Sequence, residues 1–353
     1  MSYHEQFSTD PSSTISNVVL EETEDFTSSA NRLHVMGDCI NNFSSGSINR
    51  LVSFGFDKCI RVWDVDKGEV LSSQLVSDNC VGTAKLCYSR DGCRVATSYG
   101  FTIFIWNIDS QGSLELLHTV HTVHIVIFAL NLNYDGSCVF SGHADGCLRR
   151  WDSESGELLW AHSTHKGKPV FAADISYDGT LIASAGELLI RIASIENGEE
   201  ICQLFGHSGT VRSIQFNPDA SMIASGSIDT TIRIWNVAGQ HEAMVLEGHN
   251  DVVTSLSYCP DGTRLASSSR DKSVMMWDVV SGVCLFVLRD AFKNSVNSVS
   301  FNHDGSRIAS GGYDRAIIIW DSVSGCEVMR LEGHSDSVTG VCYLPATSEY
   351  LLK

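Results

Sequence analysis

The chain lacks the patterns that build helical and membrane proteins. Its 353 residues contain no apolar run of about 18 residues, the length that a transmembrane helix needs. We also find no 12-residue stretch that sustains apolar residues at positions i, i+3, i+4 and i+7, the spacing of an amphipathic helix. We therefore expect no membrane span, and we expect a fold built from β-strands.

Basic residues are scarce. The chain has 24 Lys and Arg against 42 Asp and Glu, which gives a net charge of −18. Nucleic acids and anionic membranes are bound by basic surfaces, so we expect no direct nucleic-acid partner. The first 31 residues have no Lys or Arg, unlike a signal peptide. Their six acids are Glu5, Asp10, Glu21, Glu22, Glu24 and Asp25.

We interpret residues 1–31 as an acidic, mobile N-terminal tail and residues 32–353 as the folded part. The composition of the tail favours a solubilising leader. A phosphorylation target and a partner-docking strip are the alternatives, because hydroxyl-bearing residues precede its acidic run.

The cysteines lack the clustering of a metal site. All twelve are scattered, without a Cys-x-x-Cys pair, and Cys87, Cys138 and Cys342 fall on expected strands. Small buried hydrophobes in a reducing compartment explain this pattern better than disulfides or zinc. We expect no metal, no cofactor and a cytoplasmic location, with the nucleus as the alternative.

What the chain does have is a tryptophan that returns every 42 to 45 residues, at Trp63, Trp106, Trp151, Trp235, Trp277 and Trp320. The gap from Trp151 to Trp235 is twice this period, and at its midpoint Ala193 takes the place of the tryptophan. Seven units therefore lie in register. A fixed period of this length indicates a repeat architecture.

Each unit is predicted to contain four strands. Residues 207–247 have apolar segments at 211–216, 222–226, 231–235 and 243–246. Asp-Gly turns, which favour positive φ, join the first two strands at Asp91-Gly92, Asp135-Gly136, Asp178-Gly179, Asp261-Gly262 and Asp304-Gly305. A further glycine follows each tryptophan position, at Gly68, Gly112, Gly156, Gly198, Gly239, Gly282 and Gly325.

The units resemble WD40 repeats, and the chain resembles a WD40 β-propeller. The resemblance rests on Trp-Asp pairs such as Trp277-Asp278, on Gly-His pairs such as Gly248-His249, and on an Asp six residues before the tryptophan, as at Asp271. It covers roughly residues 38–345. It implies an all-β ring of seven four-stranded blades that closes by combining strands from both ends of the chain.

The two chain ends leave the closure open. An eighth unit begins at Gly333-His334, offers strands at 338–343 and 350–352, and stops. Two weak strand candidates, 15–20 and 32–36, precede the first unit. We favour seven complete units with a terminal remnant. The alternatives are an eighth, composite blade built from both ends and a chain truncated from a longer repeat array.

Ser, His and Asp recur at offsets that could be mistaken for catalytic triads. Recurrence favours a structural role, because an enzyme needs one nucleophile. In WD40 repeats these groups form a hydrogen-bonded chain with the tryptophan, which the resemblance assigns here to His207, Ser225, Asp229 and Trp235, and to His249, Ser267, Asp271 and Trp277.

Several units depart from this pattern. Units two and four lack the turn Asp, unit four also lacks the tryptophan, and unit seven has Arg289-Asp290 in the Gly-His region. We expect this hydrogen-bonded chain to hold units five and six together best, and we expect unit four to be the weakest unit.

The function that the resemblance implies is a non-catalytic scaffold that docks peptides or partner-protein loops on one face. The matching positions that combine aromatic rings and guanidinium groups, typical of interface hot spots, are Phe56, Phe171, Arg212, Arg270 and Tyr313. Packing between blades is an equal alternative for the two phenylalanines. A substrate-recruiting receptor of a ubiquitin ligase or RNA-processing complex, and lastly an enzyme on a propeller frame, are the alternative functions.

Overall fold

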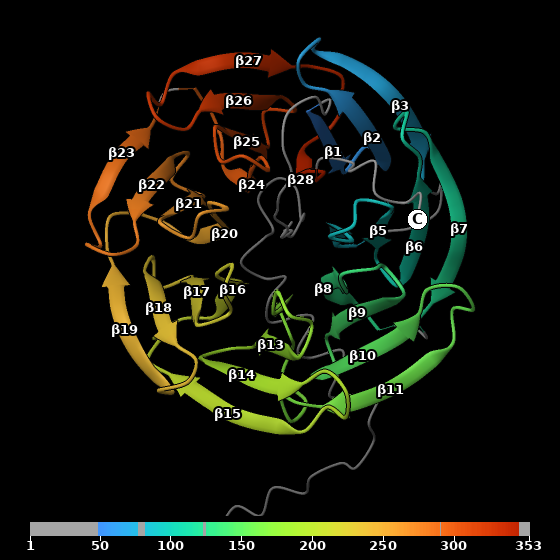
Figure 1. The fold of residues 1–353 in the computed structure, drawn as a ribbon, viewed down its shortest axis with the longest axis vertical. Helices are drawn as coiled ribbons and strands as arrows, with labels where there is room; N and C mark the ends of the chain where they lie inside the picture. The colour runs from blue at the N-terminus through green and yellow to red at the C-terminus, as the bar shows by residue number, and fades with distance from the viewer. Residues whose placement is uncertain (1–48, 77–81, 123–124, 290, 346–353) are drawn as a thin grey trace, which may run out of the picture. The chain divides into compact units, whose positions relative to one another are not determined.

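The computed structural model describes residues 49–76, 82–122, 125–289 and 291–345. These residues form 28 β-strands, arranged as seven four-stranded antiparallel sheets around a ring (Figure 1), and they contain no helix. The predicted all-β propeller with seven four-stranded blades is confirmed. The proposed acidic tail, residues 1–31, lies outside the described residues.

The blades are numbered in chain order, and their strands are given from the centre outward. Blade one consists of β28 (Val338–Tyr343), β1 (Arg50–Gly55), β2 (Cys59–Asp64) and β3 (Glu69–Leu75). Blade two consists of β4 (Ala84–Tyr88), β5 (Arg94–Tyr99), β6 (Thr102–Ile108) and β7 (Leu114–His121). Blade three consists of β8 (Ile127–Leu132), β9 (Cys138–His143), β10 (Cys147–Asp152) and β11 (Leu158–Ser163).

The remaining blades follow the chain without interruption. Blade four consists of β12 (Ala172–Ile175), β13 (Leu181–Ala185), β14 (Leu189–Ser194) and β15 (Glu200–Phe205). Blade five consists of β16 (Val211–Phe216), β17 (Met222–Ser227), β18 (Ile232–Asn236) and β19 (His241–Leu246). Blade six consists of β20 (Val253–Tyr258), β21 (Arg264–Ser269), β22 (Val274–Asp278) and β23 (Cys284–Leu288). Blade seven consists of β24 (Val296–Phe301), β25 (Arg307–Gly312), β26 (Ile317–Asp321) and β27 (Glu327–Leu331).

The ring closes through the C-terminal strand. β28 pairs antiparallel with β1, with Tyr343 opposite Leu51 and Cys342 opposite Val52. The start of the eighth unit is therefore the inner strand of blade one. Closure by strands from both ends of the chain, which the resemblance implies, is confirmed, and the expectations of a leftover remnant and of an eighth blade were both wrong for the described residues. The first unit itself supplies only three strands. This pairing removes a sheet edge that would otherwise be open. The other strand candidates near the chain ends lie outside the described residues.

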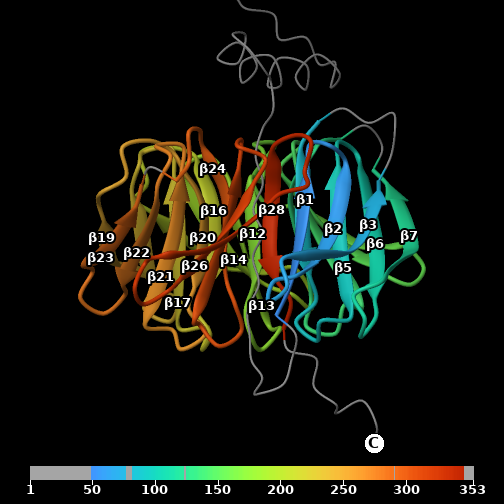
Figure 2. The same cartoon turned by 90° about the horizontal axis from the view of Figure 1, so that it is seen from above.

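The inner strands hold neighbouring blades together. They contact one another around the ring (Figure 1), and the strands run through its thickness (Figure 2). At matching positions of five inner strands, a side chain forms a hydrogen bond with the backbone of the inner strand in the next blade. The donor–acceptor distances are 2.7 Å for Asn131 Nδ2 to Ala173 O, 2.7 Å for Phe216 N to Asp174, 2.6 Å for Tyr258 N to Gln215, 3.0 Å for Phe301 N to Ser257 and 3.2 Å for Tyr343 N to Ser300.

A β-bulge marks the tryptophan position in every blade. Where the third strand pairs with the fourth, the register shifts immediately before Trp63, Trp106, Trp151, Ala193, Trp235, Trp277 or Trp320. A bulge redirects the side chain that follows it. Blade four keeps the bulge although it has an alanine there, so the backbone geometry does not depend on the indole.

The turn residues agree with the predicted positions except in blade five. Six of the seven glycines expected after the tryptophan position have positive φ, from 69° to 84°. In blade five the left-handed residue is Gln240, with φ 54°, rather than the expected Gly239. Gln240 lies five residues after Trp235, the usual distance of the turn glycine, so the register of the turn has decided the conformation.

Candidate functional site

Blade five contains a buried chain of four polar side chains, here called a tetrad. The imidazole of His207 lies 2.8 Å from Asp229 through Nδ1 and 2.8 Å from the Ser225 hydroxyl through Nε2. The indole Nε1 of Trp235 donates to the same hydroxyl at 2.7 Å. The tetrad therefore joins the loop that enters the blade, its second strand, the next turn and its third strand. Its members satisfy one another in the interior, where unpaired polar groups are costly.

Electrostatics in this tetrad favour a neutral imidazole and an ionised carboxylate. Burial lowers the pKa of His207, although contact with Asp229 opposes this effect. Burial also opposes ionisation of Asp229, but hydrogen bonds from Thr231 and His207 outweigh it and lower the pKa of the carboxyl to about 2. A neutral His207 that donates from Nδ1 to Asp229 and accepts the Ser225 proton at Nε2 fits these contacts.

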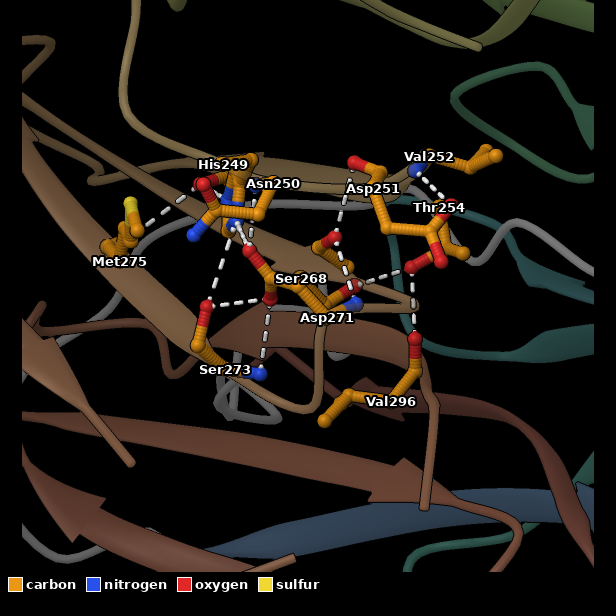
Figure 3. A network of polar contacts seen from close by, with 12 residues as sticks. His249, Asn250, Asp251, Val252, Thr254, Ser268, Asp271, Ser273, Met275 and Val296 are labelled. Carbon is orange, nitrogen blue, oxygen red and sulfur yellow. Dashed lines mark hydrogen bonds and ion pairs between the residues drawn. The ribbon is translucent and has the colours of Figure 1, made fainter. Parts of the chain in front are cut away.

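Blade six repeats the tetrad. His249 lies 2.9 Å from Asp271 and 2.7 Å from the Ser267 hydroxyl, to which Trp277 donates at 2.8 Å. Figure 3 shows His249, Asp271 and Ser273 turned toward one another; Ser273 donates to Asp271 at 2.5 Å. Although burial raises the pKa of Asp271, hydrogen bonds from His249 and Ser273 outweigh this effect and hold the pKa well below its usual range.

Blade one has a third complete tetrad, which sequence reasoning did not assemble. His334, just before the C-terminal strand, lies 2.9 Å from Asp57 and 2.7 Å from the Ser53 hydroxyl, and Trp63 donates to that hydroxyl at 2.7 Å. The signal was present, because Gly333-His334 and Asp57 both matched the repeat pattern. Joining them required knowing that the last strand completes the first blade.

The predicted partner-binding residues lie on one face of the ring. This surface, here called the entry face, carries the loops into the inner strands and the turns between second and third strands. The turn residues bond to the adjacent loops through their backbone nitrogens, over distances of 2.9 Å for Phe56 to Ser337 O, 2.9 Å for Ile228 to Thr210 O, 3.0 Å for Arg270 to Val252 O and 3.1 Å for Tyr313 to Ser295 O. The two kinds of segment are therefore held side by side.

Two of the five predicted contact residues are buried. Phe56 is 5% exposed and Phe171 is 3% exposed, so neither ring is presented to a partner, contrary to the predicted anchoring role. Phe56 packs in an apolar cluster between blades one and two. Phe171 packs against Phe128 of blade three in a tilted arrangement, with 5.0 Å between ring centroids. Neighbouring blades cover both rings, which the position in the repeat could not indicate.

The other three predicted residues are half-buried on the entry face. The guanidinium of Arg212 lies over the Phe171 ring, 4.4 Å from its centroid. Arg270 and Tyr313 follow the second strands of blades six and seven, at matching positions. Phe171 thus supports Arg212 from below, and the three half-buried residues belong to blades five, six and seven.

Comparison with known protein families identifies the repeat. A family model described as "WD domain, G-beta repeat" matches residues 114–152, 198–236, 241–278 and 282–321. The chain contains WD40 repeats. Each match begins with, or just before, the outer strand of one blade and continues through three strands of the next, so the WD40 sequence repeat is offset from the structural blade.

Several curated WD40-type relatives match part of the chain. Autophagy-related protein 16 of Arabidopsis thaliana is 24% identical over 58% of this chain and 48% of its own length. COMPASS component SWD3 of Saccharomyces cerevisiae is 31% identical over 39% of this chain and 43% of its own length. The serine-threonine kinase receptor-associated protein of Gallus gallus is 25% identical over 52% of this chain and 51% of its own length. The chain thus spans about half the length of these relatives.

Four blades depart from the complete tetrad. Blade seven places Phe292 where the histidine belongs, 6.3 Å from the Trp320 ring. The Gly-His counterpart there is Ala291-Phe292 and not the Arg289-Asp290 region named from the sequence. Blade three uses His143 from its own second strand, and blade two joins Trp106 directly to Thr97. Blade four retains only a contact of 3.0 Å between His165 and Ser184.

The tetrads of blades five and six have a structural role. The serines of blades five and six are fully buried, whereas a nucleophile must be reached by substrate. Within the described residues, no group of three His, Cys, Asp or Glu side chains is placed to hold a metal ion. No described helix could cross a membrane.

Proposed function

We propose that the protein is a non-catalytic scaffold that docks a peptide or a loop of a partner protein on its entry face. The observation that carries this proposal is the row of half-buried Arg212, Arg270 and Tyr313 on three consecutive blades, with Arg212 lying over the buried Phe171 ring. Arg and Tyr are enriched at interface hot spots. A rigid ring holds such groups at fixed mutual positions before the partner arrives, which reduces the entropy lost on binding.

The relatives support an interaction role of this kind. One is named as a component of the COMPASS complex and another as a protein associated with a kinase receptor. From the relatives we take only the general role of assembling with proteins. We expect the partner of this chain to be a segment that offers hydrogen-bond acceptors to the guanidinium groups of Arg212 and Arg270. It would also offer an apolar or hydrogen-bonding group to Tyr313.

The test is quantitative affinity purification of the full chain from its source cells, followed by mass spectrometry. We expect the double variant Arg270→Ala/Tyr313→Ala to lose at least one partner that the wild type captures. The matched control is Lys67→Ala/Tyr134→Ala, which removes an exposed cation and an exposed tyrosine from the opposite face. Equal capture by the wild type and by both variants would overturn the proposal.

A further inference from the structure

The missing tryptophan of blade four leaves a pocket. Ala193 follows the same bulge as the six tryptophans, so its side chain is directed to the place where the other blades bury an indole. A pocket of about 390 Å³ opens there, between the outer strands of blades three and four. Its lining includes His162, Thr164, Lys166, Arg191, Ala193 and Glu200. Most of these side chains are polar or charged, so the site is not an ordinary apolar packing defect.

Blade five shows how the same place is filled when the tryptophan is present. Around Gly206, an added Cβ would lie 2.8 Å from Arg233 Nη1, 3.0 Å from Trp235 Cη2 and 3.1 Å from Glu242 Oε2. The arginine, the indole and the glutamate therefore converge at one point. Register assigns Arg191, Ala193 and Glu200 of blade four to these three positions, with Thr164 in place of the glycine.

The arginine of blade four is thus retained without the indole beside it. Arg191 bonds to Glu200 through Nη1, as Arg233 bonds to Glu242. The Arg191 side chain is only 10% exposed, and its Nε has no hydrogen-bond partner among the described residues. Arg233 also has an unpartnered Nε, but there an indole occupies the adjacent space. In blade four no indole occupies that space, and Arg191 lines the pocket that opens there.

The charges of the pocket favour an anion. Arg191 and Lys166 contribute two positive charges, and Glu200 contributes one negative charge that already accepts hydrogen bonds from Arg191 and Gln203. A guanidinium presents its donors in a planar fork that matches two oxygens of a carboxylate or phosphate. Ser163 and Thr164 also line the wall. The pocket is therefore locally positive, although the protein as a whole has a net charge of −18.

We propose that this pocket binds a small ligand through a two-oxygen anionic group, a carboxylate or a phosphate, with Arg191 as the anchoring residue. The site is separate from the entry-face residues Arg212, Arg270 and Tyr313, so it stands whether or not a partner docks on them. The absent indole is, on this view, a functional substitution that converts a packing position into a binding site.

The test is isothermal titration calorimetry of the full chain with inorganic phosphate and, separately, with citrate, against sodium chloride at matched ionic strength. We expect saturable binding of at least one of the two anions, and the stronger of the two identifies the anion class. Arg191→Gln removes the positive charge, and Arg191→Lys keeps the charge but removes the planar guanidinium. Each should weaken binding by about tenfold or more. The matched control Arg233→Gln, which removes the equivalent arginine of blade five, should leave affinity unchanged.

Substitution of Arg191 could weaken binding by destabilising the fold, so a second variant tests the pocket with Arg191 left in place. Ala193→Trp combined with Thr164→Gly places an indole in the pocket and leaves the arginine in place, and it should abolish binding. Folding of each variant is checked by its thermal unfolding curve. The proposal is overturned if neither anion binds saturably, if the filled pocket binds as well as the wild type, or if Arg233→Gln weakens binding as much as Arg191→Gln.

Discussion

Blades four and five are neighbours with the same strand order and different interiors. Both have four strands in the same order, a bulge at the tryptophan position and an Arg–Glu pair across the outer strands. Blade five adds a complete tetrad, whereas blade four has only His165 and Ser184. The difference shows that turns, register and contacts between blades are sufficient to form a blade. The tetrad is therefore not required for a blade to form.

The first prediction concerns the tryptophan of blade five, which is replaced by alanine as in blade four. Trp235 is 1% exposed and packs among apolar residues of both blades. We expect Trp235→Ala to lower the free energy of unfolding by about 4 kcal/mol, because it removes a large buried side chain from a site with no compensating residue. Urea denaturation measures this loss.

Val280→Ala is the control for that measurement, since Val280 is 82% exposed in a turn of blade six and should change stability by less than about 0.5 kcal/mol. If Trp235→Ala costs as little as the control, the indole does not stabilise the blade, and the contrast between the two blades loses its energetic basis.

The second prediction concerns the joint between the two blades. Asp174 of β12 is buried and accepts a hydrogen bond from Phe216 N of β16. Burial raises the pKa of this carboxyl to about 6, above its ordinary value of 3.8. The folded state therefore favours the protonated form, and stability that is fully present below pH 3.8 is lost as pH rises through about 6. The shift corresponds to about 3 kcal/mol at most.

Asp174→Asn should remove this dependence. The amide oxygen can still accept from Phe216 N, and it carries no charge to bury. We expect the variant to gain about 2–3 kcal/mol relative to the wild type between pH 4 and pH 7, as measured by urea denaturation at both pH values. A constant difference between the two proteins across this interval would show that Asp174 ionises in the fold as readily as in the unfolded chain.

The period of the sequence was sufficient to predict the ring. Strand β16, predicted at residues 211–216, has these bounds in the structure, because local alternation of apolar residues and turn chemistry specify it. Closure was predictable only in part, because the resemblance implies that strands from both chain ends share one blade but leaves open which strands pair. The Asp57–His334 contact joins residues 277 positions apart, so no local pattern records it. Only the pairing of β28 with β1 shows which blade the last unit completes.

The candidate sites were predictable in position but not in exposure. The repeat placed Phe56 and Phe171 on the entry face, but contacts with neighbouring blades bury both rings. Ala193 was visible as a missing tryptophan, yet its consequence depends on whether neighbours collapse into the space. Trp160 of blade three packs against the apolar cluster that includes Ala193, while Arg191 and Glu200 line the opening that remains. Such repacking follows from side chains of two blades together, which the sequence of one repeat does not contain.

The last prediction restores blade four to the pattern of blade five and has the smallest effect. Ala193→Trp alone should not stabilise the protein, because Thr164 stands where the complete blades have a glycine. An added Cβ at Gly206, Gly248 or Gly333 would lie 3.0 Å from the tryptophan Cη2 of its blade, which is tight contact. With Thr164→Gly, the indole can enter, bury its ring and donate to the Ser184 hydroxyl. We expect this double variant to gain about 1 kcal/mol over the wild type and the two changes to couple favourably by about 1–2 kcal/mol in a urea-denaturation double-mutant cycle. Strict additivity would mean that Thr164 does not obstruct the indole, and blade four would then differ from blade five by the missing ring alone.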